Sequence, residues 1–413
     1  MLTEQENERL SRVGPGTPMG ALLRRYWHPI AATEDIEREE VLPVRILGEN
    51  LVLYKTTGGE LGLIQERCPH RSASLAYGVP DEQGLRCPYH GWLYNAEGKC
   101  LDQPYESTED PESTYKDKII VDAYPVETLG GLVWTYMGPP EGRPLLPRWD
   151  VLARDDYHRR IGITHLPCNW LQCMENSLDP VHFEWLHANV MNYAAKRLGQ
   201  EPAMFPARHR RIGFDRFQYG IYKRRLLEND DPETSPDWLT GHPILFPNTL
   251  DIGGSLQIRV PIDDTNTLHI VYSTNERKPD EPERIEVYDA PHTHEDGRLF
   301  TESIIGTDML AWVTQGPMTP RNLEHLGVSD RGIIMYRQEL SDAIDAVARG
   351  DDPPGLVRNP EDNFPWIEIP CESTPRAAFR RPGQQRETGY VTAVEAAEPP
   401  KRRRVSGLVP RVV

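Results

Sequence analysis

Two short helical patterns open the chain. Thr3 precedes the first pattern and Glu6 follows three residues later, a capping-box arrangement that favours a helix over residues 2–12. A turn rich in Gly and Pro separates this helix from a second helical pattern over residues 19–26. We therefore predict an N-terminal helical segment over residues 1–26.

Short apolar segments bounded by turn residues follow the helices. Gly, Asn and Glu residues separate the first three of them, as in β-hairpins. We therefore predict a small all-β domain over residues 27–138. Its predicted strands are residues 44–47, 51–55, 62–65, 119–121 and 131–136, with a further hairpin at 93–98.

The pattern changes after a connection rich in Pro and Gly at residues 139–148. Long helical stretches now mix with strands, and residues 256–260 and 268–272 alternate with period 2, as half-buried strands do. We predict a larger α+β domain over residues 145–380, so that the fold class of the whole chain is α+β. Residues 381–413 have few large apolar side chains, and we predict a flexible tail.

Composition narrows the class of protein. A chain of 413 residues exceeds one ordinary core, and its 38% hydrophobic content contains no apolar run that spans a bilayer. The acidic N-terminus lacks an apolar signal segment, so we expect a cytoplasmic protein. The net charge of −17 argues against nucleic acid as a partner. The Cys residues outside the motif described next are expected to be reduced thiols.

Two short segments each carry one Cys and one His. Cys68 and His70 form the first pair, and Cys87 and His90 form the second. Two thiolates and two imidazoles suit a [2Fe–2S] cluster in which His replaces Cys on one iron and raises the reduction potential. The same donor set also suits structural zinc. The Pro after each Cys and the flanking residues resemble the Rieske signature, of the type without an additional disulfide.

A second group of candidate ligands lies in the α+β domain. His182 and His187 are five residues apart, and Asp179 lies three before the first. Residues i and i+5 lie about 140° apart on an α-helix, so both His can bind one metal only if the helix ends, bends or carries a π-type bulge. Asp179 followed by Pro180 is typical of a helix start. Two His and one carboxylate form the ligand set of non-haem iron(II) that activates oxygen.

The carboxylate of this second group must come from elsewhere in the chain. Asp308 lies in a predicted helix among apolar residues, where a buried carboxylate needs a cation or a hydrogen-bond partner. Glu302 is the competing candidate. We expect Asp308 to be the third ligand.

Together these motifs resemble the catalytic subunit of Rieske non-haem iron oxygenases. The resemblance extends from about Gly14 to at least Asp330. Residues 12–20 and 25–29 are similar to the phthalate dioxygenase branch, and residues 167–179 are similar to dehydrodivanillate O-demethylases. The resemblance implies that the larger domain has an antiparallel sheet and helices that carry mononuclear iron.

The resemblance also implies roles for the motif residues. Asp179 takes the place of the carboxylate that connects a cluster His of one subunit with an iron His of its neighbour. The resemblance further implies a homotrimer or a trimer-based hexamer, with O₂ as co-substrate. Electrons from NAD(P)H would arrive only through a separate flavin and [2Fe–2S] reductase, with or without a ferredoxin. The implied cluster ligands are Cys68, His70, Cys87 and His90, and the implied iron ligands are His182, His187 and Asp308.

The implied reaction is hydroxylation or oxidative O-demethylation of a carboxylated, methoxylated or aryl ether compound. The Arg on which phthalate-specific members rely has no counterpart in residues 238–247, which leaves a larger aromatic acid as the expected substrate. The alternatives are cis-dihydroxylation of a phthalate-like acid and a non-catalytic Rieske electron carrier or redox sensor. Six basic residues are candidates for binding a carboxylate: Arg208, Arg210, Arg211, Lys223, Arg224 and Arg225.

Overall fold

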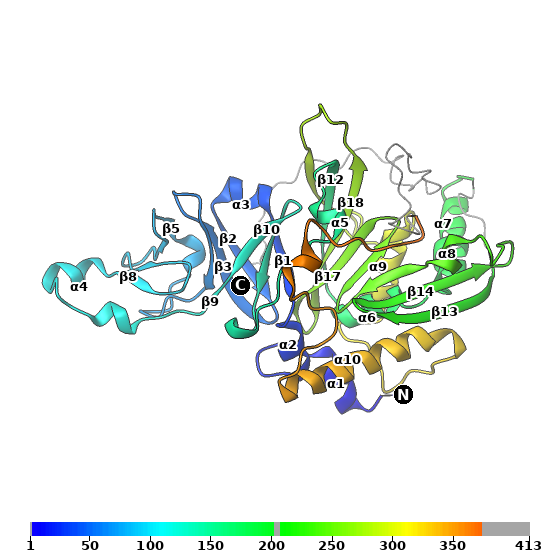
Figure 1. Cartoon of the computed structure of the whole chain (residues 1–413), viewed down its shortest axis with the longest axis horizontal. Coiled ribbons are helices and arrows are strands. Elements are labelled where there is room, and N and C mark those ends of the chain that lie inside the picture. The colour runs from blue at the N-terminus through cyan, green and yellow to red at the C-terminus, as the bar shows by residue number, and fades with distance from the viewer. Residues whose placement is uncertain (1, 202–206, 374–413) are drawn as a thin grey trace. The chain divides into compact units, whose positions relative to one another are not determined.

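The chain forms two compact units in a computed structural model that describes residues 2–201 and 207–373 (Figure 1). One unit comprises Arg24–Leu146, and the other combines residues 2–23 with residues 147–201 and 207–373. Small antiparallel sheets make up the first unit, and a large sheet with helices makes up the second. This arrangement confirms the predicted α+β class. The predicted tail at residues 381–413 lies outside the described residues.

Three small sheets build the unit Arg24–Leu146. Their strand orders are β1-β11-β10, β2-β3-β4-β9 and β5-β6-β7-β8, and every pair in them is antiparallel. The strands are β1 (Trp27–Ala32), β2 (Val41–Ile46), β3 (Glu49–Lys55), β4 (Leu61–Gln65), β5 (Val79–Pro80), β6 (Leu85–Arg86), β7 (Leu93–Tyr94), β8 (Cys100–Asp102), β9 (Ala123–Tyr124), β10 (Val126–Leu129) and β11 (Leu132–Tyr136). Short helices connect them: α3 (Thr33–Glu39), η1 (Leu75–Tyr77), α4 (Pro104–Glu109), η2 (Tyr115–Lys118) and η3 (Pro140–Gly142).

The strand predicted at residues 119–121 is wrong. Only an isolated bridge between Lys99 and Ile120 forms there, and the next strand, β9, begins at Ala123. The helical turn η2 ends immediately before this segment, and Ile120 points into solvent. Residues 119–121 therefore lie beside the hairpin that contains Lys99 but do not form a strand of its sheet.

The core of this unit includes both motif Cys residues. Cys68 and Cys87 are buried in one cluster of side chains, with Trp92 and Tyr94 beside them. The Cys residue of each loop is therefore packed into the core of this unit. Packing of this kind fixes the position of a ligand before any metal binds.

One eight-stranded sheet dominates the second unit. Its strand order is β13-β14-β15-β16-β17-β18-β12-β19, and only β12 with β19 is parallel. The strands predicted at residues 256–260 and 268–272 lie within β17 and β18. The strands are β12 (Tyr157–Leu166), β13 (His209–Phe217), β14 (Gly220–Leu227), β15 (His242–Leu245), β16 (Thr249–Ile252), β17 (Ser255–Asp263), β18 (Asn266–Glu276) and β19 (Ile285–Asp289).

The N-terminal helices belong to the second unit, where α1 and α2 contact α10 (Figure 1). The capping box is confirmed, since Thr3 Oγ1 accepts from the Glu6 N–H and Glu6 Oε2 accepts from the Thr3 N–H. The second helix ends at Leu23, earlier than predicted. The helices are α1 (Glu4–Ser11), α2 (Pro18–Leu23), α5 (Asp150–Ala153), α6 (Trp170–Ser177), η4 (Phe183–Val190), α7 (Met191–Arg197), α8 (Pro236–Leu239), α9 (Ile304–Thr314), η5 (Val328–Asp330), α10 (Arg331–Arg349) and α11 (Pro360–Asn363).

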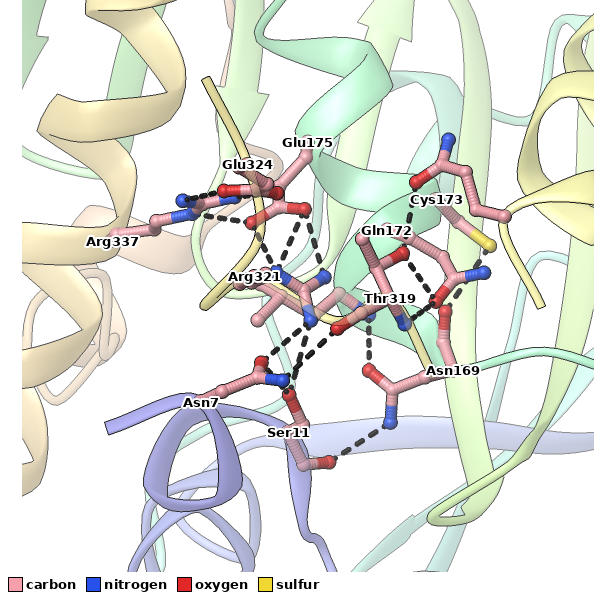
Figure 2. A network of polar contacts seen from close by, with 12 residues as sticks. Asn7, Ser11, Asn169, Gln172, Cys173, Glu175, Thr319, Arg321, Glu324 and Arg337 are labelled. Atoms are coloured by element: carbon pink, nitrogen blue, oxygen red, sulfur yellow. Dashed lines mark hydrogen bonds and ion pairs between the residues drawn. The ribbon is translucent and has the colours of Figure 1, made fainter. Parts of the chain in front are cut away.

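A buried ion network ties α6 to α1 and α10 (Figure 2). Glu175 of α6 accepts from Arg321 Nε at 2.9 Å and from Arg337 Nε at 2.6 Å. Arg321 also donates to Asn7 Oδ1 at 3.0 Å and to Ser11 Oγ at 3.2 Å on α1. Each charge in the network is buried and paired, which is the condition under which buried ions are tolerated.

A second set of contacts fixes α6 to α9. Gln172 Nε2 donates to the carbonyl oxygens of Trp312 and Gly316 at 2.7 and 2.8 Å, where α9 ends. Its Oε1 accepts from the Thr319 N–H at 3.1 Å (Figure 2). The two helices therefore keep a fixed relative position. The same contacts position the segment that follows α6 and the side chains that α9 carries.

We expect Arg321→Met to destabilise the second unit strongly. The substitution leaves Glu175 buried with one cation fewer, and breaking a buried pair from one side costs about 3–5 kcal/mol. Differential scanning calorimetry measures the change as a fall in the melting temperature. The matched control is Arg349→Met, because Arg349 pairs with Asp351 at 3.0 Å with both side chains about 60% exposed. We expect about 1 kcal/mol or less there. Equal shifts in the two variants would contradict the role of the network.

Candidate metal centres

The two Cys-containing loops share one backbone frame. The N–H groups of Cys68 and Cys87 each donate to the carbonyl oxygen five residues later, at 3.0 and 2.8 Å. Their own carbonyl oxygens each accept from the N–H four residues later, at 2.8 and 3.0 Å. That fourth residue has positive φ in both loops, 58° at Ser72 and 74° at Gly91. The two loops are therefore equivalent turns of the backbone, in which the His lies two residues after Cys68 and three residues after Cys87.

The side chains of the two loops converge. The rings of His70 and His90 have centroids 4.5 Å apart, and His70 stacks on Trp92 at 4.4 Å with an interplanar angle of 7°. Cys68 and Cys87 are buried, whereas His90 is exposed. Sulfur donors thus lie inside the unit and imidazole donors lie nearer its surface.

Hydrogen-bond donors surround the sulfur atoms. The N–H groups of Tyr89 and His90 donate to the Cys87 sulfur. Tyr94 Oη lies 3.2 Å from Cys68 Sγ. Burial raises the pKa of the Cys87 thiol, so a thiolate at this position is best stabilised by a metal. This donor set, with N–H groups aimed at sulfur, fits a [2Fe–2S] cluster.

A break and a π-helix position the two His of the second site. Helix α6 ends at Ser177, and Asp179 Oδ1 then accepts from the Val181 N–H at 2.8 Å. The π-helix η4 follows from Phe183, later than the helix start predicted at Pro180, because Asp179 closes a turn first. Hydrogen bonds in a π-helix run from i to i+5. His182 and His187 consequently share one face, with their Nε2 atoms 3.2 Å apart.

Asp308 of α9 completes this group. Its Oδ1 lies 3.3 Å from His187 Nε2 and 3.6 Å from His182 Nε2, and ligand atoms of all three residues lie within 4.8 Å of one another. Glu302, the competing candidate, pairs with His294 at 3.3 Å and lies outside the group. The structure therefore brings together the three residues expected from the sequence.

Thr307 holds the ring of His187 in a fixed orientation. The Thr307 hydroxyl lies 2.8 Å from the Ile304 carbonyl oxygen, to which it donates, and 3.0 Å from His187 Nδ1. A hydroxyl that donates to a helix carbonyl can accept from Nδ1–H, and this contact turns Nε2 of His187 toward the other two ligands. Burial lowers the pKa of His182 to about 3, so that ring is neutral. Lone pairs from two imidazoles and one carboxylate face a common point, an arrangement that fits a divalent cation.

Two residues around this group escaped sequence reasoning. Thr307 orients His187, and Phe183 packs edge-on to the same ring at 5.9 Å. Both are sequence neighbours of candidate ligands. A Thr or Phe next to a ligand in the sequence does not indicate whether its side chain contacts a ligand in the fold. Asp179 lies at the margin, with Oδ2 3.8 Å from His182 Nδ1, beyond hydrogen-bond distance.

The structure separates the six basic candidates. Arg224 and Arg225 pair with Asp215 and Asp237, at 2.5 and 2.7 Å. Lys223 is buried beside them. Arg210 and Arg211 line a pocket of about 510 Å³, together with Val181, His209, Ile212, Trp238, Val328 and Arg331. Arg208 is exposed, near the start of the range described from residue 207 onward.

Known proteins are similar in sequence to most of this chain. Residues 26–125 match the family described as the Rieske [2Fe-2S] domain. The 5,5′-dehydrodivanillate O-demethylase oxygenase subunit of Sphingobium sp. (strain NBRC 103272 / SYK-6) is 44% identical over 88% of this chain and 85% of its own length. The phenoxybenzoate dioxygenase subunit alpha of Ectopseudomonas oleovorans is 32% identical over 86% of this chain and 88% of its own length.

A solved structure supports the fold. Pseudomonas putida CBB5 NdmA superposes with a TM-score of 0.57 at 21% identity, over 81% of this chain and 94% of that chain. Among the residues that the structure describes, no helix is long and apolar enough to cross a membrane.

We expect Thr307→Val to weaken metal binding at the His182, His187 and Asp308 group by about 10- to 100-fold, the usual effect of losing a partner of a ligating His. Equilibrium dialysis against Co²⁺ measures the affinity. Thr314→Val is the matched control on the same helix, because the Thr314 hydroxyl donates only to backbone carbonyl oxygens. Unchanged affinity in Thr307→Val would show that the hydroxyl does not orient His187.

Proposed function

This chain belongs to the oxygenase subunits of Rieske non-haem iron systems, and we propose that it oxidises an aromatic acid carrying methoxy or aryl ether groups. The observation that carries the proposal is the convergence of two imidazoles and one buried carboxylate in the second unit. The relatives named above are oxygenase subunits, and they match most of this chain. The chain is therefore an oxygenase component that contains a Rieske [2Fe–2S] domain.

In this proposal each centre has its own ligands. Cys68, His70, Cys87 and His90 bind the cluster. His182, His187 and Asp308 bind mononuclear iron. When bound, the cluster supplies single electrons and the iron activates O₂. The protein contributes a neutral ring at His182, a Thr307 hydroxyl that orients His187 through Nδ1, and a largely buried site.

Asp179 is the proposed connection between centres of neighbouring subunits. It precedes His182 by three residues, and Val181 between them lines the pocket that carries Arg210 and Arg211. We propose that a cluster His of a second copy reaches Asp179, in a homotrimer or a trimer-based hexamer. In this arrangement Asp179 accepts a hydrogen bond from an imidazole on either side.

Charge supports this assembly. The segment between α4 and η2 borders the second cluster loop, because Pro104 adjoins Gly91 and Tyr115 contacts Trp92. That segment exposes Glu109, Asp110 and Glu112, whereas Arg210, Arg211 and Arg331 line the pocket beside Val181. Opposite charges on the two surfaces favour association of the acidic segment beside the second cluster loop of one copy with the pocket of another copy.

The electrons are proposed to come from a separate flavin and [2Fe–2S] reductase that oxidises NAD(P)H, with or without a ferredoxin. This chain has no Gly-x-Gly-x-x-Gly fingerprint for a dinucleotide and no further set of Cys with ferredoxin spacing. A basic donor protein would find an acidic partner here, given the net charge of −17.

The proposed substrate class follows from the relatives. 5,5′-Dehydrodivanillate is a biaryl diacid with methoxy groups, and phenoxybenzoate is a diaryl ether acid, so an aryl ether and a carboxylate are common to both. Oxidation of a methoxy carbon releases formaldehyde, whereas attack on a ring gives a cis-diol. The greater similarity to the demethylase favours the first outcome. Cis-dihydroxylation is the second candidate, and similarity to the phenoxybenzoate dioxygenase favours it.

The proposal is tested with holoprotein, a surrogate reductase, NADH and 5,5′-dehydrodivanillate. We expect O₂ uptake that depends on the substrate, with about one formaldehyde released for each O₂ consumed. A cis-diol without formaldehyde would replace demethylation by dioxygenation. Cluster reduction without substrate-dependent O₂ uptake, across a panel of aryl ether acids, would contradict an oxygenase of this class and favour the electron carrier.

We expect Asp179→Asn to slow oxidation of the cluster in a single turnover by about 10- to 100-fold, while both centres keep their iron. Asn retains the oxygen that accepts from the Val181 N–H, so the turn before η4 persists. Stopped-flow absorbance of the reduced protein mixed with O₂ and substrate measures the rate. Asp296→Asn is the control, since Asp296 is exposed and pairs only locally with Arg298. A normal rate in Asp179→Asn would remove the connecting role.

A further inference from the structure

Strand β14 presents two cations on one face, and their surroundings differ. Lys223 and Arg225 are two residues apart, so their side chains project from the same side of the strand. Arg225 is neutralised by Asp237, at 2.7 Å. Lys223 is only 5% exposed. Among the residues that the structure describes, no hydrogen bond or ion pair to its ammonium group is found.

This face of β14 is turned toward the candidate iron site. The guanidinium group of Arg225 lies over the ring of Phe183 at 4.6 Å, and Phe183 packs edge-on to His187 at 5.9 Å. Lys223 itself attracts the carboxylates of Asp179 and Asp308 electrostatically, although neither forms an ion pair with it. The free ammonium group therefore belongs to the same interior region as the site.

An ammonium group buried in this way is unfavourable by itself. Removing a charge from water costs several kcal/mol unless a partner compensates. Burial, and then the charge of Arg225, lower the pKa of Lys223 to about 8, which reflects that cost. Neither nearby carboxylate is paired with it, because Asp308 faces the two His and Asp179 Oδ1 accepts from the Val181 N–H.

The compensating charge must then come from a molecule that enters the site. We propose that Lys223 is the anchor for a carboxylate of the aromatic substrate. This inference rests on the proposed function, because it supposes an aryl carboxylate as substrate. Two other buried basic groups of this sheet do not take this role. Arg259 donates to the carbonyl and side-chain oxygens of Gln257. Burial lowers the pKa of His269 well below the usual value and leaves it neutral.

The anchor predicts that charge on the substrate and charge at position 223 act together. Two probes test it: 5,5′-dehydrodivanillate and its bis-carboxamide, in which neutral groups of similar shape replace both carboxylates. Dissociation constants are measured by isothermal titration calorimetry on the holoprotein. We expect Lys223→Met to weaken binding of the diacid by about 10- to 100-fold, the range for losing a hydrogen bond between charged groups, and to change binding of the diamide by about threefold or less.

Stability distinguishes an anchor from a structural lysine. If only a bound ligand compensates the charge of Lys223, Lys223→Met removes an uncompensated charge from the ligand-free protein. The melting temperature of the ligand-free protein then stays the same or rises. Lys278→Met is the matched control, because Lys278 is 84% exposed with Glu281 4.0 Å away; it should change neither affinity nor stability. Lys223→Gln provides a second neutral variant with a polar end.

Three results would overturn the anchor. Equal weakening of diacid and diamide would show that Lys223 supports the site in general. Unchanged affinity for the diacid in both variants would show that its carboxylates bind elsewhere. A wild-type protein that binds no aryl carboxylate in a broader panel would overturn the proposed substrate class, and the anchor with it.

Discussion

The whole site depends on one change of helical register. Two His five residues apart lie on different faces of an α-helix, but in η4 their Nε2 atoms are 3.2 Å apart. A π-helix is rare and is found mainly where function requires it. Here the chain first breaks at Asp179 and Pro180, so that η4 does not continue the α-helical register of α6. The rest of the second unit keeps this unusual segment in place.

Two sets of buried contacts fix helix α6, which precedes this segment. Glu175 and its two Arg partners fix α6 against α1 and α10, and Gln172 fixes α6 to the end of α9. Because η4 follows α6 and Asp308 lies on α9, both parts of the ligand group are attached to the same rigid frame. Thr307 then orients His187 by a single hydrogen bond. Preorganisation of this kind lets two imidazoles and one carboxylate face one point without a metal to draw them together.

Local chemistry was predictable from the sequence, and long-range geometry was not. The capping box at Thr3, the alternating strands and the Cys and His pairs each follow from a few neighbouring residues, and the structure contains the predicted elements. The failed strand at residues 119–121 had the right composition but no neighbouring strand that extended along it. The choice between Asp308 and Glu302 depended on how α9 packs against η4, which the sequence does not display. Likewise, six basic residues looked equivalent until the fold paired Arg224 and Arg225 with carboxylates and left Lys223 buried, with no partner among the described residues.

The central claim is that the chemistry takes place at the His182, His187 and Asp308 group and that the cluster alone is insufficient. The most direct measurement is a single turnover of protein that contains a full complement of cluster and graded amounts of mononuclear iron. The protein is reduced, freed of reductant and mixed with O₂ and 5,5′-dehydrodivanillate, and the oxidised products are quantified. The account predicts that product per chain rises in proportion to mononuclear iron and is absent when only the cluster is present. The same amount of product at every iron loading would contradict it.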